Sequence, residues 1–274
     1  MDDAQVARLR RDAHERALRR PRLPFAGTVH DEARDGVGLR RYVPEASDAG
    51  TAVVFLHGGY GLLGDLELQD GPCRRLATAL TAPVVAVDYR LAPEASLAES
   101  AEDALTALAL LAAEGVGRLA LVGDSAGGTV AVAAARRAHG TPLAPAWLAL
   151  TNPNLDLTLG SFDAARPGGP DPALSAASFR AWTRVEDLAD APRFDLDASA
   201  LPPTFLAVGD QDALLPEARA LADACARDGV RCELLELPGA SHGFLGGDDA
   251  PAVLARLRAF VRDSAAADTR APRP

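Results

Sequence analysis

Short apolar runs alternate with alanine- and leucine-rich stretches from residue 51 almost to the end of the chain, and this alternation limits the folds that are open to it. The runs have the length and composition of buried strands, and the stretches between them have the length of helices. Parallel strands need such crossover helices, which cover both faces of the sheet. The pattern therefore predicts an α/β fold with a mostly parallel sheet. The expected strands are 51–56, 83–88, 119–123, 146–151, 204–209 and 232–237, and the expected helices are 72–80, 96–114, 126–139, 217–228 and 250–264.

Two segments depart from this alternation. Ranges 27–34 and 37–43 flank Asp35-Gly36, a dipeptide typical of hairpin turns, so we expect an antiparallel pair that makes the sheet mixed at one edge. Residues 161–200 contain a stretch rich in proline and glycine and then one expected helix, from about 175 to 190. An insertion of this length is typical of a lid or a substrate-binding segment. The predicted organisation is an N-terminal cap helix (1–25), an α/β core (26–160 and 201–264), a cap insertion (161–200) and a flexible tail (265–274).

The charged residues exclude several classes of protein. All 28 basic residues are arginine. Without lysine, the chain cannot form a lysine Schiff base, a phosphate-loop site, a kinase-type ATP site or a Ser-Lys dyad. The 38 acidic residues give a formal net charge of -10, which disfavours a nucleic-acid partner.

The cysteines and the distribution of apolar residues indicate the cellular compartment of the protein. Cys73, Cys225 and Cys232 occur at no metal-ligand spacing, so we interpret them as packing residues and expect no metal site. The N-terminal residues alternate charged and apolar side chains, unlike the apolar core of a signal peptide. The longest apolar stretch, near 104–113, is about half of the length that a membrane span needs. These features predict a soluble, cytoplasmic protein that does not bind membranes.

The segment Gly123-Asp124-Ser125-Ala126-Gly127-Gly128 follows an apolar run and opens an alanine-rich stretch. A G-x-S-x-G motif between a strand and a helix holds its serine on a tight turn, with the hydroxyl exposed above the sheet. The N-terminus of the following helix favours an anionic intermediate there. The alternative, a glycine-rich turn with an incidental serine, leaves the flanking strand and helix unexplained. Ser125 is the expected nucleophile.

A serine nucleophile needs a histidine base and a carboxylate that orients the base. His242 follows the last expected strand, and the carboxyl ends of parallel strands meet at one edge of the sheet. Two aspartates follow strand 204–209. We expect Asp212 to be the acid, because Asp210 adjoins the strand and is better placed to stabilise the turn. The order Ser125, Asp212, His242 is that of α/β-hydrolases.

The loop His57-Gly58-Gly59-Tyr60-Gly61 follows the first expected parallel strand. Acyl transfer needs backbone N–H donors that face the developing oxyanion, and glycines let the chain approach it closely. The predicted oxyanion hole consists of Gly58, Gly59 and Tyr60 together with Ala126. We interpret His57 as a residue that holds the shape of this loop, and not as a base.

The sequence resembles the hormone-sensitive-lipase-like (HGGG-type) family of α/β-hydrolase esterases between about residues 51 and 262. Four blocks carry the resemblance: His57-Gly58-Gly59 with Gly64-Asp65-Leu66, Asp88-Tyr89-Arg90-Leu91-Ala92-Pro93-Glu94, Gly123-Asp124-Ser125-Ala126-Gly127-Gly128, and Ser241-His242-Gly243-Phe244. The resemblance implies the α/β-hydrolase fold and a serine carboxylesterase that hydrolyses small to medium acyl esters. It also implies an acyl-enzyme intermediate, no cofactor, and a cap built from the N-terminal helix and the 161–200 insertion.

The chain departs from the family pattern at several positions. Tyr60 replaces the third glycine of the oxyanion loop, which keeps the N–H group and places a phenol beside the acyl or alcohol pocket. Asn152-Pro153-Asn154 occurs where a Tyr-Pro pair is common. No departure removes a catalytic group, so they bear on substrate preference and not on reaction type.

Several residues are candidates for contact with a small acyl ester, the expected partner. Phe179 and Trp182 lie three apart on the expected cap helix and share a face, which either lines the acyl pocket or packs the cap onto the core. Because the chain has no lysine, Arg180 or Arg184 is the candidate for binding an anionic substrate group. Both a monomer and a homodimer remain open. The expected substrate-binding residues are Tyr60, Asp124, Phe179, Trp182 and Phe244.

Three other functions are alternatives to a carboxylesterase. The same groups could hydrolyse an amide, a carbamate or a lactone, or could transfer the acyl group to another acceptor. The fold could instead serve as a non-catalytic receptor for a small molecule, but the complete set of Ser125, Asp212 and His242 argues against it. A purely structural protein would need four motif blocks to occur in order by accident.

Overall fold

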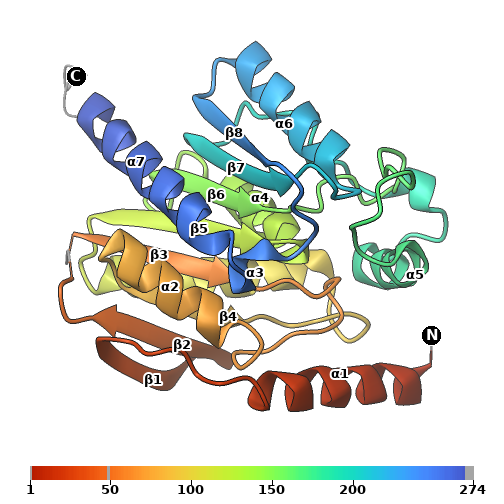
Figure 1. Cartoon of the computed structure of the whole chain (residues 1–274), viewed down its shortest axis with the longest axis horizontal. Coiled ribbons are helices and arrows are strands. Elements are labelled where there is room, and N and C mark those ends of the chain that lie inside the picture. Colours follow the sequence, from red (N-terminus) through yellow and green to blue (C-terminus); the bar gives the residue numbers. More distant parts are fainter. Residues whose placement is uncertain (1, 48–49, 269–274) are drawn as a thin grey trace.

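The structure, a computed structural model, describes residues 2–47 and 50–268. Its centre is an eight-stranded sheet with the order β1-β2-β4-β3-β5-β6-β7-β8 (Figure 1). The strands are β1 (Gly27–Arg34), β2 (Val37–Pro44), β3 (Thr51–Leu56), β4 (Val84–Asp88), β5 (Arg118–Asp124), β6 (Trp147–Thr151), β7 (Thr204–Gly209) and β8 (Cys232–Leu237).

The sheet is mixed at one edge, as the sequence predicts. β1 and β2 form an antiparallel hairpin, β2 is antiparallel to β4, and all other neighbouring strands are parallel. Asp35 and Gly36 have φ values of 49° and 83° at the hairpin turn. Two consecutive residues with positive φ are the signature of the type I′ turn, whose twist matches that of the strands.

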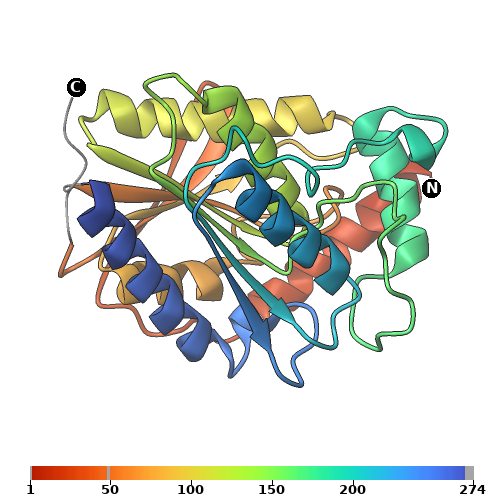
Figure 2. The ribbon, with the colours of Figure 1, turned by 90° about the horizontal axis from the view of Figure 1, so that it is seen from above.

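Helices cover both faces of the sheet (Figures 1 and 2). On one face α3, α4 and α6 pack into a core with the apolar side chains of β3 and β5, and on the other face α2 and α7 form a second core. The parallel strands are therefore buried on both sides, which explains their nearly continuous apolar sequences. The helices are α1 (Asp3–Leu18), α2 (Asp70–Leu80), α3 (Leu97–Ala113), α4 (Ala126–Ala138), α5 (Pro172–Thr183), α6 (Leu215–Asp228) and α7 (Ala250–Asp268).

The N-terminal helix α1 lies at the same end of the molecule as α5, and both views agree on this (Figures 1 and 2). A capping box starts α1, in which Asp2 and Gln5 each accept a hydrogen bond from the other's backbone N–H. Arg10 then ties the helix to the core by donating to the carbonyl of Ala92 at 2.7 Å and pairing with Glu94 at 2.8 Å. Glu94 closes one of the four motif blocks, so the block has a structural role here.

Two expected boundaries were wrong. The cap helix α5 spans Pro172–Thr183 and not 175–190, because Asp171 caps its start and the chain turns left-handed at Arg184, with φ 59°. A separate short 3-10 helix, η1 (Leu188–Asp190), follows. Helix α7 continues to Asp268 and takes in four residues of the expected tail. The remainder of that tail, 269–274, lies outside the described residues.

Candidate active site

Ser125 sits on the sharp turn between β5 and α4. Its backbone has φ 54° and ψ -120°, values that a non-glycine residue rarely adopts and that cluster at functional sites. The turn brings α4 so close to β3 that a side chain at Gly127 would collide with the carbonyl oxygen of Leu56. The small residues of the motif are therefore required by packing, and Ser125 is left only 7% exposed, at the wall of a pocket.

His242 joins Ser125 to Asp212. The Nε2 atom of His242 lies 2.8 Å from the Oγ of Ser125, and its Nδ1 lies 2.8 Å from the Oδ2 of Asp212. In the tautomer that satisfies both contacts, Nδ1–H donates to the carboxylate and Nε2 accepts from the serine hydroxyl. The structure thus brings together the three residues that the sequence selects, from the ends of β5, β7 and β8.

Asp212 is fully buried, and its carboxylate is held by more than His242. Its Oδ1 accepts from the N–H of Leu214 at 3.0 Å. In the amide orientation that satisfies both of its polar atoms, Asn152 donates to Oδ2 of Asp212 at 3.0 Å and accepts from the N–H of Gly243 at 3.1 Å. Asn152 therefore fixes both the acid and the loop that carries His242.

Asp210 has a different set of contacts. Its Oδ1 accepts from the N–H of Gly239 at 2.8 Å and from the side chain of Gln211 at 2.8 Å. These bonds close the turn between the ends of β7 and β8, which is the structural position that the sequence indicates for this residue.

The pKa of His242 is raised above its ordinary value. Burial by itself disfavours the charged imidazolium, but the hydrogen bond and the negative charge of Asp212 outweigh this cost, with a smaller contribution from Asp124. Asp212 therefore makes His242 a stronger base than burial alone would allow.

The loop after β3 lies against Ser125. Gly59 has a φ of 129°, and any side chain there would collide with the carbonyl oxygen of Leu63. The backbone N–H groups of Gly59, Tyr60 and Ala126 have no acceptor among the described residues. Such unpaired donors beside a nucleophile suit an oxyanion.

Tyr60 connects this loop to the cap. Its backbone is left-handed, with φ 64°. The phenol oxygen accepts from the N–H of Asp171 at 3.0 Å, and the carbonyl oxygen accepts from the hydroxyl of Ser178 in α5 at 2.6 Å. Two contacts with the cap thus hold a residue whose backbone conformation costs free energy.

His57 lies behind the loop and is fully buried by its surroundings. The Nδ1 of His57 contacts the carbonyl oxygen of Gly58 at 2.9 Å, and its ring stacks on that of Tyr89 at 4.3 Å between centroids. The Tyr89 hydroxyl donates to the backbone carbonyl oxygen of His57 at 2.7 Å. Burial lowers the pKa of His57, so the ring is neutral. These contacts fit the loop-shaping role that the sequence indicates.

Ser125 and His242 face a pocket of about 250 Å³. Asp124 lies on its wall, where Thr151 donates to the carboxyl group at 2.6 Å and burial raises its pKa. Beyond Ser125, His242 and Asp124, the walls include Gly58, Gly59, Tyr60, Arg20, Leu68, Gln69 and Leu245.

Three expected substrate-binding residues do not line this pocket. Phe179 and Trp182 are fully buried in the core that joins the cap to the sheet, and the Trp182 Nε1–H donates to the Ser100 hydroxyl at 2.9 Å. They pack the cap onto the core, which was the alternative interpretation. Phe244 belongs to the core beneath α2 and α7. These side chains are apolar enough to fill a core, and a sequence pattern does not distinguish that use from lining a pocket.

Arg180 and Arg184 are exposed on the cap and also lie away from the pocket. The arginine at its wall is Arg20, which follows α1 and which the sequence did not single out. Sequence reasoning also missed Asn152 as a partner of Asp212. The presence of Asn152 where the family commonly has a Tyr-Pro pair was a usable signal. Arg20 offered no such signal, because its position depends on how α1 packs.

No group of three or more metal-binding side chains occurs among the described residues. No helix in the described part of the chain is both long and apolar enough to span a membrane. The cysteines Cys73, Cys225 and Cys232 are free.

The fold and the site together define an α/β-hydrolase with a serine on the sharp turn between β5 and α4. A family described as alpha/beta hydrolase fold matches residues 53–246. Esterase LipI of Mycobacterium tuberculosis is 34% identical over 246 residues, which cover 82% of this chain and 76% of that protein. A solved esterase of Pyrobaculum calidifontis superimposes with a TM-score of 0.80 at 28% identity, over 97% of this chain and 94% of that one.

A solved esterase from the bacterial hormone-sensitive lipase family shares the fold, with a TM-score of 0.77 at 22% identity over 96% of this chain and 99% of that one. The chain belongs to the α/β-hydrolase family, and the relatives it resembles include esterases. The resemblance found in its four motif blocks is thereby confirmed.

Proposed function

We propose that the protein is a serine carboxylesterase. One observation carries the proposal: contacts run without a break from Asp212 through His242 to Ser125, beside amide N–H groups that have no acceptor in the described part of the chain. Similarity to esterases supports the same reaction. This arrangement provides a nucleophile, its base and an oxyanion hole, which are the parts that acyl transfer needs.

In the proposed mechanism, Ser125 Oγ attacks the ester carbonyl carbon while its proton passes to Nε2 of His242. The carbonyl oxygen becomes an oxyanion, and the N–H groups of Gly59, Tyr60 and Ala126 stabilise it, with each donor worth about 3 kcal/mol. The tetrahedral intermediate expels the alcohol, which takes the proton from His242, and an acyl-enzyme remains. Water then attacks this ester by the same steps and releases the acid.

The pocket indicates the size of the substrate. A volume of about 250 Å³ lies just below the range of about 300 to 1,000 Å³ that is common for drug-sized ligands, which favours small to medium acyl esters. We also propose that α1 and the 161–200 insertion act as the cap of this site, since Arg20 and Tyr60 connect them to its walls. The mechanism uses no cofactor.

Hydrolysis of p-nitrophenyl esters by wild type and Ser125→Ala tests the assignment. We expect the wild type to release p-nitrophenol and the variant to lose this activity, because its oxyanion donors remain but its nucleophile is absent. Equal rates in the two proteins would overturn the proposal. Amide, carbamate and lactone substrates should be measured in parallel, and a preference for any of these would reassign the substrate class within the same mechanism.

A further inference from the structure

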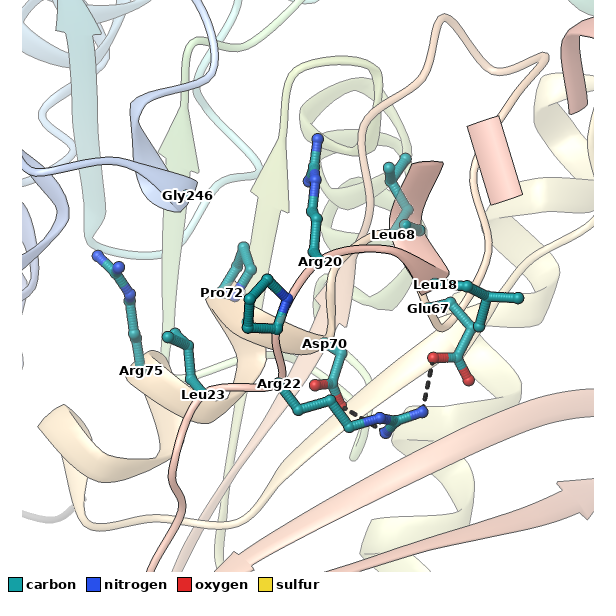
Figure 3. Close-up of a pocket in the computed structure, with 13 residues that line it drawn as sticks. Leu18, Arg20, Arg22, Leu23, Glu67, Leu68, Asp70, Pro72, Arg75 and Gly246 are labelled. Atoms are coloured by element: carbon teal, nitrogen blue, oxygen red, sulfur yellow. Dashed lines mark hydrogen bonds and ion pairs between the residues drawn. The ribbon is translucent and has the colours of Figure 1, made fainter. Parts of the chain in front are cut away.

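A second cavity lies beside the linker between α1 and β1 (Figure 3), and it shares part of its wall with the catalytic pocket. The second cavity has a volume of about 200 Å³, and its walls come from this linker and from the start of α2. Arg20, Leu68, Pro72 and Gly246 belong to the walls of both cavities. A substrate longer than the catalytic pocket would therefore pass Arg20 on its way from Ser125 to the second cavity.

The acidic side chains of the second cavity are already paired. Glu67 binds Arg22 at 2.9 Å and Arg40 at 2.7 Å. Asp70 binds Arg74 at 2.7 Å and lies 3.6 Å from Arg22. These carboxylates are therefore neutralised by Arg22, Arg40 and Arg74.

Two further arginines in the same walls have no carboxylate partner among the described residues. Arg20 makes no side-chain hydrogen bond or ion pair with them, and Arg75 donates only to the carbonyl oxygen of Gly247, at 2.6 Å. Figure 3 shows both side chains extending away from the paired carboxylates. A guanidinium stays charged at every working pH and binds carboxylate or phosphate through two parallel hydrogen bonds. The second cavity is therefore cationic in a chain whose net charge is -10.

The end of the catalytic pocket beside Ser125 carries carboxyl groups and, among the described residues, no arginine. Asp124 lies on its wall, and Asp212 lies behind His242. An anionic group is disfavoured beside these carboxyl groups and favoured beside Arg20 and Arg75. The charges would thus orient a substrate that carries an anion at one end and an ester at the other.

We propose that Arg20 and Arg75 form an anion subsite that selects esters bearing a carboxylate or a phosphate remote from the scissile bond. The proposal rests on the proposed esterase function, whose substrate class it narrows. The anion can belong to the acyl part or to the alcohol part of the ester, and the two arms of the test below distinguish these cases.

The test compares matched charged and neutral esters in two arms. In the acyl arm the pair is p-nitrophenyl hydrogen glutarate and p-nitrophenyl pentanoate, and in the alcohol arm it is p-acetoxybenzoate and p-acetoxybenzamide. For each pair the ratio of kcat/KM, charged over neutral, is measured in wild type, Arg20→Gln and Arg75→Gln. We expect the ratio to fall about tenfold or more in Arg20→Gln in one arm, which identifies the part that carries the anion, because a hydrogen-bonded charge is lost.

Arg16→Gln is the matched control, because Arg16 is exposed on α1 and lines neither cavity. It should keep the wild-type ratio in both arms. An unchanged ratio in Arg20→Gln and Arg75→Gln in both arms would overturn the subsite.

A binding measurement separates this result from failure of the esterase assignment. Calorimetry with p-acetamidobenzoate and its neutral amide, p-acetamidobenzamide, needs no turnover. Tighter binding of the carboxylate by wild type, lost in Arg20→Gln, supports the subsite even if no ester is hydrolysed. Equal binding of the two compounds by wild type, together with unchanged charged-to-neutral kcat/KM ratios in the variants, overturns the anion subsite. Hydrolysis of the neutral esters then tests the esterase function separately.

Discussion

Glu217 lies fully buried in the first turn of α6. Its pKa predicts how the free energy of unfolding depends on pH. Its Oε2 accepts from the N–H groups of Leu155 at 2.5 Å and Asp156 at 2.8 Å, whereas Oε1 has no partner among the described residues. Burial raises the pKa of Glu217 to about 8; the two N–H donors oppose the shift in part, and the charges of Asp156 and Asp195 add to it. The folded protein therefore holds this carboxyl group protonated at neutral pH.

The sign of the pH dependence follows from this pKa. Between about pH 4.5 and pH 8 the unfolded chain has an ionised Glu217 and the folded chain a protonated one, so unfolding releases a proton. The free energy of unfolding should therefore fall as pH rises, by about 1.4 kcal/mol per pH unit and about 5 kcal/mol over the whole window. Glu217→Gln keeps an oxygen acceptor for the two N–H groups and cannot ionise. It should gain stability relative to wild type as pH rises.

Urea unfolding of wild type and Glu217→Gln, at pH values from about 5 to about 8, measures this difference. The difference in unfolding free energy should grow steadily across the series. Glu186→Gln is the matched control, since its side chain is exposed and its curve should run parallel to that of wild type. Parallel curves for wild type and Glu217→Gln would refute the raised pKa.

Four further predictions concern the active site. Asp212→Asn should lower kcat/KM for p-nitrophenyl esters by about 10⁴-fold and Asp210→Asn by less than about tenfold; the reverse order would assign the acid to Asp210. Because Asp212 raises the pKa of His242, the acidic limb of the kcat/KM profile should lie above about pH 6.5 in wild type and move to lower pH in Asp212→Asn, and an unmoved limb would contradict this coupling. Asn152→Ala should lower kcat about tenfold with KM nearly unchanged, by freeing Asp212 and the His242 loop; a change confined to KM would place Asn152 in substrate binding instead. Tyr60→Phe should lower the free energy of unfolding by about 1 kcal/mol through loss of the bond to Asp171, measured by urea unfolding, and unchanged stability would show that the bond contributes nothing.

Strand positions and the grouping of the proposed catalytic residues were predictable because they follow from local patterns. Ranges 51–56, 204–209 and 232–237 were expected as strands and are strands, because each is a short run rich in apolar residues that a glycine or a proline bounds within two residues. Side chains at the ends of neighbouring parallel strands must meet at one edge, so Ser125, Asp212 and His242 could be grouped before any geometry was available.

The cap was harder to predict, because its form depends on tertiary contacts. The start and end of α5 are set by the cap at Asp171 and the left-handed Arg184, signals that a run of apolar residues conceals. The burial of Phe179 and Trp182 depends on how closely α5 packs against the core. In the same way, Arg20 reaches the pocket only because α1 packs across the core. Long-range packing of this kind leaves no periodic trace in the sequence.

The double attachment of Tyr60 to the cap limits how far this protein is modular. Asp171 and Ser178 belong to the insertion, whereas Tyr60 belongs to the loop beside the nucleophile. A chimaera that exchanged residues 161–200 for the cap of a relative would remove both partners and leave a strained tyrosine where the family has glycine. Residue 60 must therefore be exchanged together with the insertion, and the unit of recombination is the cap plus one residue of the core.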